Sequence, residues 1–261
     1  MTQKKPGYDL LPDPGFFSDS HTTSFRMDSL SRGRERLLLD GTWQLQDFGR
    51  FQQLYAEVYS FFAAIDLLKA ANVNDDVKSR LRNLISSLPY QGGGSYLSVF
   101  RGLDKELPKE VGVGLVGITK NSPGEMVLAG VGDHFTDAKL AVQTFVEHSG
   151  SARQMYSQLH NFLKRLGLLK ESVSKYSRAD AANGEIEAMA RSLLTVYGVH
   201  DYDMLKDICS GNSLAVAKVA LGFHRRVANS AVFFLLRGVF NFVIINLNQK
   251  EKIFQFLICV W

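Results

Sequence analysis

The stretch RLLLDGTWQLQDFGRFQQLYAEVYSFFAAIDLL, residues Arg36–Leu68, decides the fold. Its first residues predict a short strand, Arg36–Asp40, which turns at Gly41 and Thr42. A long helix follows, because large apolar residues recur at three- and four-residue steps, the period of a helix with one apolar face. Such a stripe must be covered, so we expect the rest of the chain to pack around it. The stripe consists of Phe48, Phe51, Leu54, Tyr55, Val58, Phe61, Phe62, Ile65 and Leu68.

Two further strands and seven further helices are predicted downstream. The runs Val113–Thr119 and Glu125–Val131 flank the turn formers of Lys120–Gly124, which indicates a hairpin. Together with the first strand, they predict an α+β fold with a small antiparallel sheet of about three strands, packed by the long amphipathic helix and followed by a helical extension. The expected helices are Asp75–Leu88, Tyr96–Leu107, Asp133–Ser149, Ala152–Lys170, Glu185–Tyr197, Asp201–Cys209 and Asn212–Ala228.

Composition divides the chain into four parts. Residues 1–34 are polar and rich in Ser, Pro and Gly, which is typical of a disordered arm, and Met27 is an alternative start within it. Residues 35–150 form the expected α+β domain, and residues 151–229 form the helical extension. Residues 230–261 are an apolar tail. The first 30 residues contain no apolar core of a signal peptide.

The overall balance is that of an ordinary globular protein, with 46% hydrophobic and 21% charged residues. The net charge is +4, but Lys and Arg are scattered, so a nucleic-acid partner is not favoured. Only two cysteines are present, Cys209 and Cys259, which is too few for a secreted disulfide scaffold. We therefore expect a reducing compartment, the cytoplasm.

The tail Ser230–Trp261 has three interpretations. Its first part, SAVFFLLRGVFNFVIINL, is short for a membrane span of about 20 residues. It also contains Arg237, which costs roughly 2.5–3.5 kcal/mol at the centre of a span. A hairpin of FVIINL with KIFQFLICVW is slightly favoured over the third interpretation, a segment foreign to the fold that a shifted reading frame would produce.

Glycine-rich stretches give only weak binding hypotheses. Gly112, Gly114 and Gly117 match GxGxxG, but they lie inside a predicted strand and no helix follows, so the dinucleotide motif is accidental. The loop Gly92–Ser95 lacks the Lys and the strand of a phosphate loop. Because Ser95 opens a predicted helix, residues Gly93, Gly94 and Ser95 are the candidates for contact with an anion or a partner.

Trp43, at the start of the long helix, is a second candidate contact. A tryptophan there either joins the strand to the helix by packing or faces a partner, and the packing role is more common.

No catalytic, cofactor or metal signature is found in the remaining polar residues. Six histidines are spread along the chain without a Cys partner at ligand spacing, and HExxH and GxSxG are absent from the sequence. Asp133, His134 and Asp137 suit a helix start, where carboxylates complement the helix dipole. We therefore expect no cofactor and no metal, and assign no catalytic residue.

The order of these motifs resembles a family of uncharacterised bacterial α+β proteins of unknown function. The resemblance covers about residues 35–170 and rests on Gly41-Thr42-Trp43, on Pro89-Tyr90-x-Gly92-Gly93 and on Ile118-x-x-x-Ser122-Pro123-Gly124. It implies a bacterial, cytosolic protein and transfers no catalytic residue. A looser similarity links the arrangement to adaptor modules of bacterial conflict systems.

Three hypotheses for function follow. The leading one is a non-enzymatic interaction or regulatory module in a bacterial cell, with a protein partner or self-association through the edges of the sheet. The second is an enzyme with a cleft near Gly92–Ser95 and Asn121–Gly124. The third is a membrane-associated protein held by the 230–261 tail.

Overall fold

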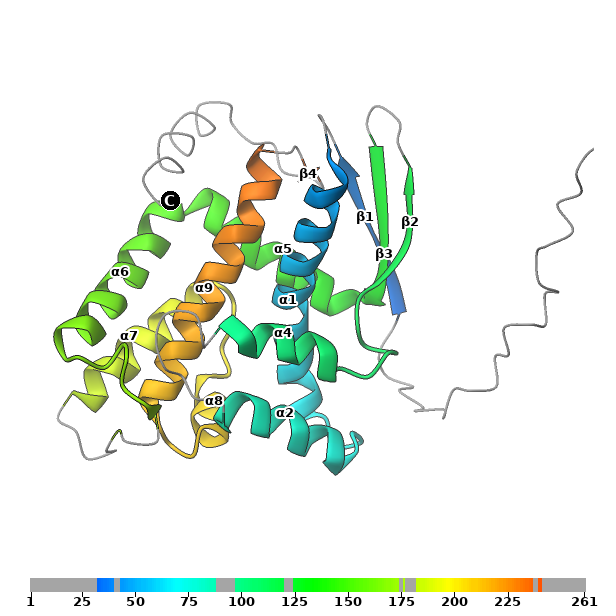
Figure 1. The fold of residues 1–261 in the computed structure, drawn as a ribbon. Coiled ribbons are helices and arrows are strands. Elements are labelled where there is room, and N and C mark those ends of the chain that lie inside the picture. The colour runs from blue at the N-terminus through cyan, green and yellow to red at the C-terminus, as the bar shows by residue number, and fades with distance from the viewer. Residues whose placement is uncertain are drawn as a thin grey trace, which may run out of the picture. The chain divides into compact units, whose positions relative to one another are not determined.

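A computed structural model describes residues 32–39, 43–87, 97–119, 124–173, 176, 182–236 and 239–240. Within these ranges the chain forms eight helices and a small antiparallel sheet, which confirms the expected α+β class (Figure 1). The elements are β1 (Arg32–Leu39), α1 (Leu45–Lys69), α2 (Asp75–Ser87), α4 (Leu97–Glu106), β2 (Gly114–Thr119), β3 (Gly124–Val131), α5 (Gly132–Glu147), α6 (Ser149–Arg165), α7 (Asn183–Val196), α8 (Tyr202–Ile208), α9 (Ser213–Leu236) and β4 (Val239–Phe240).

The sheet has the strand order β2-β3-β1-β4. The predicted hairpin is confirmed, because β2 and β3 pair antiparallel, although residues 120–123 of its turn lie outside the described residues. β1 pairs with β3 and begins at Arg32, so the expected start at Arg36 is wrong and residues 32–34 belong to the sheet rather than to the arm. The two residues of β4 pair with Leu38 and Leu39 of β1.

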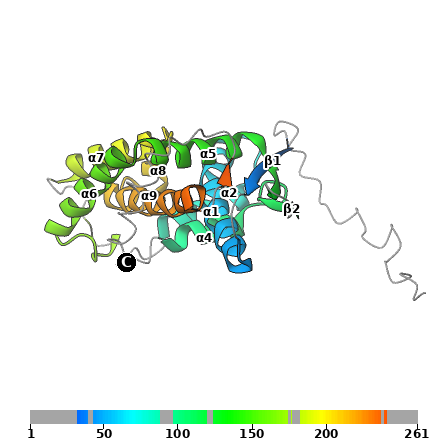
Figure 2. The ribbon, with the colours of Figure 1, turned by 90° about the horizontal axis from the view of Figure 1, so that it is seen from above.

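Helix α1 is the centre of the molecule. The predicted stripe is buried apart from Phe48, but burial continues on the other sides, so that every residue from Leu54 to Ile65 is buried. Helices α2, α4, α5 and α9 pack against it (Figures 1 and 2). Small side chains between the large ones allow these neighbours to approach closely, among them Ala56, Ser60, Ala63 and Ala64.

Helix α9 extends further than the sequence predicted. The expected end at Ala228 is wrong, because the helix continues to Leu236, and no Gly or Pro interrupts the sequence between Gly222 and Gly238. The boundary drawn at residue 230 therefore falls inside a helix. Phe233, which the sequence assigned to the tail, is buried with its ring 5.8 Å from that of Phe51.

The breaks between the other helices show where glycine matters. Gly198 and Gly211 follow α7 and α8 with φ of +78° and +77°, as their predicted role at helix ends requires. The expected break at Gly150 and Ser151 is wrong, because α5 ends before His148 and both residues lie in the first turn of α6. Glycine lowers the stability of a helix only slightly in the first turn, because the backbone N–H groups there make no hydrogen bonds within the helix.

A buried ion pair joins α1 to α9. The carboxylate Oε2 of Glu57 lies 2.6 Å from Nε of Arg226, and both side chains are almost wholly buried. Gln53 donates a hydrogen bond to Glu57 Oε1, and Arg226 donates one to the carbonyl of Leu97, so the pair also reaches α4. Burial raises the pKa of Glu57, and the charge of Arg226 opposes this shift.

We expect Arg226→Met to lower the free energy of unfolding by about 3 kcal/mol, because it leaves the Glu57 carboxylate buried without its main partner. The double variant Glu57→Gln/Arg226→Met should be more stable than Arg226→Met alone, because no buried charge remains. Urea unfolding monitored by circular dichroism measures both. Equal stability of the single and double variants would show that the pair does not control the charge of Glu57.

The loss of unfolding free energy in Arg226→Met should also become smaller as the pH falls. In this variant the pKa of Glu57 is raised further, so the folded state binds a proton that the unfolded state releases, and protonation stabilises the fold as the pH drops towards the ordinary glutamate range. Unfolding curves at several pH values test this. A loss that is constant with pH would contradict it.

Candidate functional site

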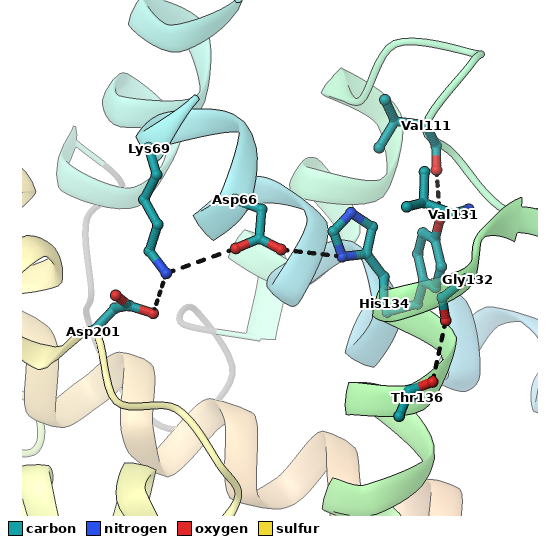
Figure 3. Close-up of polar contacts among 9 residues, drawn as sticks. Asp66, Lys69, Val111, Val131, Gly132, His134, Thr136 and Asp201 are labelled. Carbon is teal, nitrogen blue, oxygen red and sulfur yellow. Dashed lines mark hydrogen bonds and ion pairs between the residues drawn. The ribbon is translucent and has the colours of Figure 1, made fainter. Parts of the chain in front are cut away.

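Three potential ligand side chains meet where the C-terminal half of α1 passes the first turns of α5. Figure 3 shows two of them, Asp66 and His134. Asp66 comes from α1, while His134 and Asp137 lie three residues apart on α5 and so share one face of that helix. One donor atom from each residue lies within 4.8 Å of the other two. Asp66 Oδ2 lies 3.3 Å from His134 Nδ1.

The carboxylate of Asp66 stands between two different neighbours. Its Oδ2 faces His134, whereas its Oδ1 lies 3.7 Å from Nζ of Lys69, and Figure 3 shows the two contacts on opposite sides of the carboxylate. Lys69 lies closer to Asp201, at 2.6 Å, and thereby links α1 to the start of α8. Asp66 and Lys69 are both about half exposed, so solvent reaches this side of the cluster.

The electrostatics of the cluster favour a neutral imidazole and make ionisation of Asp137 less favourable. Burial lowers the pKa of His134, and the nearby Asp66 and Asp133 only partly oppose this effect. Burial raises the pKa of Asp137, and the charges of Asp66 and Asp133 raise it further. A neutral imidazole with two carboxylates is a donor set for divalent cations.

The side chain of Tyr59 packs beside His134 and fixes the start of α5. Its hydroxyl donates a hydrogen bond to the carbonyl of Val111 and accepts one from the backbone N–H of Val131, the residue before α5. Its ring packs edge-on against the imidazole, with 5.5 Å between the centroids. Gly130 is required beside it, because a Cβ there would lie only 2.7 Å from the Tyr59 hydroxyl.

The sequence did not identify this cluster. It assigned Asp133, His134 and Asp137 to a helix start, which is where α5 places them, but this role does not explain the burial of His134. The spacing of His134 and Asp137 on one helix was the available signal. Asp66 lies far away in the sequence, and only the packing of α1 on α5 brings it to the other two.

The binding candidates that the sequence proposed are found elsewhere or lie outside the described residues. Gly93, Gly94 and Ser95 are in the second group, as is most of the Asn121–Gly124 turn, of which only Gly124 is described, at the start of β3. Trp43 is half-buried and packs on Phe48, with 4.9 Å between the centroids. It also stacks on Phe233, so it joins the start of α1 to the end of α9.

A second surface with functional potential is the edge strand β2. Leu115, Val116 and Ile118 have 44%, 50% and 42% of their surface exposed. Leu115 and Ile118 pair with Leu128 and Met126 of β3, which are buried, so they lie on the same face of the sheet as these residues but remain exposed. The register shifts between Leu115 and Gly117, which places a bulge at Val116.

The other face of the sheet differs from this edge. It carries exposed charges, including an ion pair of 3.2 Å between Arg36 on β1 and Glu125 on β3, as a solvent-facing sheet surface does. Leu38 of β1 also lies on this face with 40% of its surface exposed, so exposed apolar side chains are concentrated on β2 rather than confined to it.

No family model matches the chain, and no curated protein or solved structure matches it. The resemblance to a bacterial α+β family therefore stays a prediction. No helix in the described part of the chain is long and apolar enough to cross a membrane. The apolar tail beyond Phe240 lies outside the described residues.

We expect Tyr59→Phe to lower the free energy of unfolding by about 1–3 kcal/mol, because the buried Val131 N–H and Val111 carbonyl both lose their partner. Urea unfolding measures the loss. Amide hydrogen exchange at Val131 should become faster than in the wild type, and unchanged protection there would contradict the role of Tyr59.

Proposed function

We propose that the protein is a non-enzymatic interaction module of the bacterial cytoplasm, and that β2 receives an extended segment of a partner protein. The observation that carries this proposal is the exposed apolar edge formed by Leu115, Val116 and Ile118. The polar cluster at Asp66 takes no part in it.

An edge strand of this composition is suited to strand addition. Natural edge strands usually carry Lys, Pro or inward-pointing charges that prevent pairing with other chains. The sequence of β2, GLVGIT, contains no Lys, Pro or charged residue, and the described residues place no strand on its outer side. The bulge at Val116 is the one feature of β2 that limits pairing. Backbone groups along such an edge supply affinity to an added strand, while its side chains select the sequence.

The side chains of β2 specify an uncharged, apolar partner segment. A strand added beside β2 would place alternate residues over Leu115 and Ile118 and extend the apolar surface that β3 already buries. Burying a charged side chain against these residues would be unfavourable, because β2 offers no opposite charge. A second copy of β2 has the same chemistry and is one form that the partner can take.

We expect Val116→Lys/Ile118→Lys to weaken binding of the partner at least about tenfold, ~1.4 kcal/mol, because the two new charges on β2 would have to be desolvated when the partner strand is added. The measurement is affinity purification at native expression level with quantitative mass spectrometry. Sedimentation of the purified chain at increasing concentration tests self-association. The control is Leu140→Lys, which changes an equally exposed apolar residue on α5.

Strand addition predicts that a reproducible partner, or dimer formation, is lost in the β2 variant and kept in the α5 control. A set of captured proteins that is the same for both variants, together with a monomer at every concentration, would contradict the proposal.

A further inference from the structure

We propose that Asp66, His134 and Asp137 form a binding site for a divalent transition-metal cation such as Zn²⁺ or Mn²⁺. This site is independent of the β2 edge. It uses one nitrogen and two carboxylate groups from α1 and α5.

The positions of the donor atoms already suit a cation. Ligand bonds of about 2.0–2.2 Å place two donors of a tetrahedral Zn²⁺ ion about 3.4 Å apart. The donors of the three residues lie within 4.8 Å of one another, so side-chain rotation that moves the carboxylate oxygens by about 1–2 Å brings them onto one ion. Asp66 and Asp137 are only partly buried, which leaves their carboxylates room to rotate.

The burial of His134 is the second observation that points to a ligand. Only 1% of its surface is exposed, and neither ring nitrogen makes a hydrogen bond with a residue in the described ranges, although Nδ1 lies 3.3 Å from Asp66 Oδ2. Buried polar groups of this kind ordinarily have a partner. Nδ1 is directed at Asp66 Oδ2, into the cluster, where a cation would satisfy it.

Within the described residues, Lys69 is the one permanently charged cation in contact with Asp66, so it is the alternative to a bound metal ion as the partner of this carboxylate. Its Nζ lies 3.7 Å from Asp66 Oδ1 but 2.6 Å from Asp201, so its closest partner is Asp201. The Oδ2 atom of Asp66 remains directed at His134. Lys69 therefore orients Asp66 and leaves the side shared with His134 and Asp137 for a cation.

Three protein ligands leave further coordination positions for water or for a group from a bound molecule. The half-exposed carboxylate of Asp66 marks the side from which these positions face solvent. Such a site differs from a closed four-ligand structural centre.

The test uses the purified full-length chain, stripped with EDTA and then titrated with Co²⁺ and with Zn²⁺. Visible absorption of bound Co²⁺ reports the coordination geometry, and calorimetry gives the Zn²⁺ affinity and stoichiometry. We expect one high-affinity ion per chain. Asp137→Asn, which keeps the shape of the side chain, should weaken binding by about tenfold or more.

The matched control is Asp133→Asn, which removes an exposed acidic charge from the same turn of α5 without removing a ligand. It should weaken binding by less than about fivefold, the effect of one exposed charge. His134→Gln should abolish the Co²⁺ spectrum of the site, with circular dichroism confirming that the variant is folded.

Metal binding that is the same in the wild type, Asp137→Asn and His134→Gln would place the ion elsewhere and overturn the proposal. Absence of binding to the wild type at millimolar Co²⁺ and Zn²⁺ would overturn it as well. The Val116→Lys/Ile118→Lys variant should bind the ion normally, so failure of one proposal does not decide the other.

Discussion

The structure depends on one constraint: every side of α1 between Leu54 and Ile65 must be covered by other parts of the chain. An ordinary surface helix needs cover on one face only. Because α1 is buried all round, elements from both halves of the sequence have to surround it, and α4, α5 and α9 do so from different directions. The described residues on both sides of residue 150 accordingly belong to one compact unit.

A helix buried on all sides also brings polar groups into the interior. Glu57, Tyr59 and Ser60 are three of them, and each is connected to a different neighbour. Glu57 pairs with Arg226 of α9, Tyr59 bridges backbone groups of Val111 and Val131, and Ser60 donates a hydrogen bond to Asp104 of α4. Hydrophobic burial therefore supplies the general driving force, while these contacts fix how each neighbour is oriented on α1.

The sequence was sufficient for the elements and for part of their arrangement. The apolar period of α1, the turn formers between β2 and β3, and the glycines after α7 and α8 act locally, so their structures could be predicted. The sequence was insufficient where a contact joins residues that lie far apart along the chain. Nothing near Glu57 in the sequence indicates Arg226, and nothing near His134 indicates Asp66, because only helix packing brings these residues together.

The exposed strand β2 could be predicted as a strand, but its position at the edge could not. Its run of Leu115, Val116 and Ile118 has the composition of a buried strand. Whether such a run is covered depends on how far the helix layer extends over the sheet, which no local pattern encodes. The sequence therefore indicated a sheet with free edges without showing which edge carries apolar residues.

The pairing of β1 with β4 has a consequence for folding during synthesis. β1 is the first described strand and β4 is the last described element, so the two can meet only after nearly all of the described chain has left the ribosome. Contacts between such distant residues form slowly, because a long loop must close first. Until α9 is synthesised, the side of α1 that it covers stays exposed, so the nascent chain exposes apolar surface for longer than a protein built from local contacts.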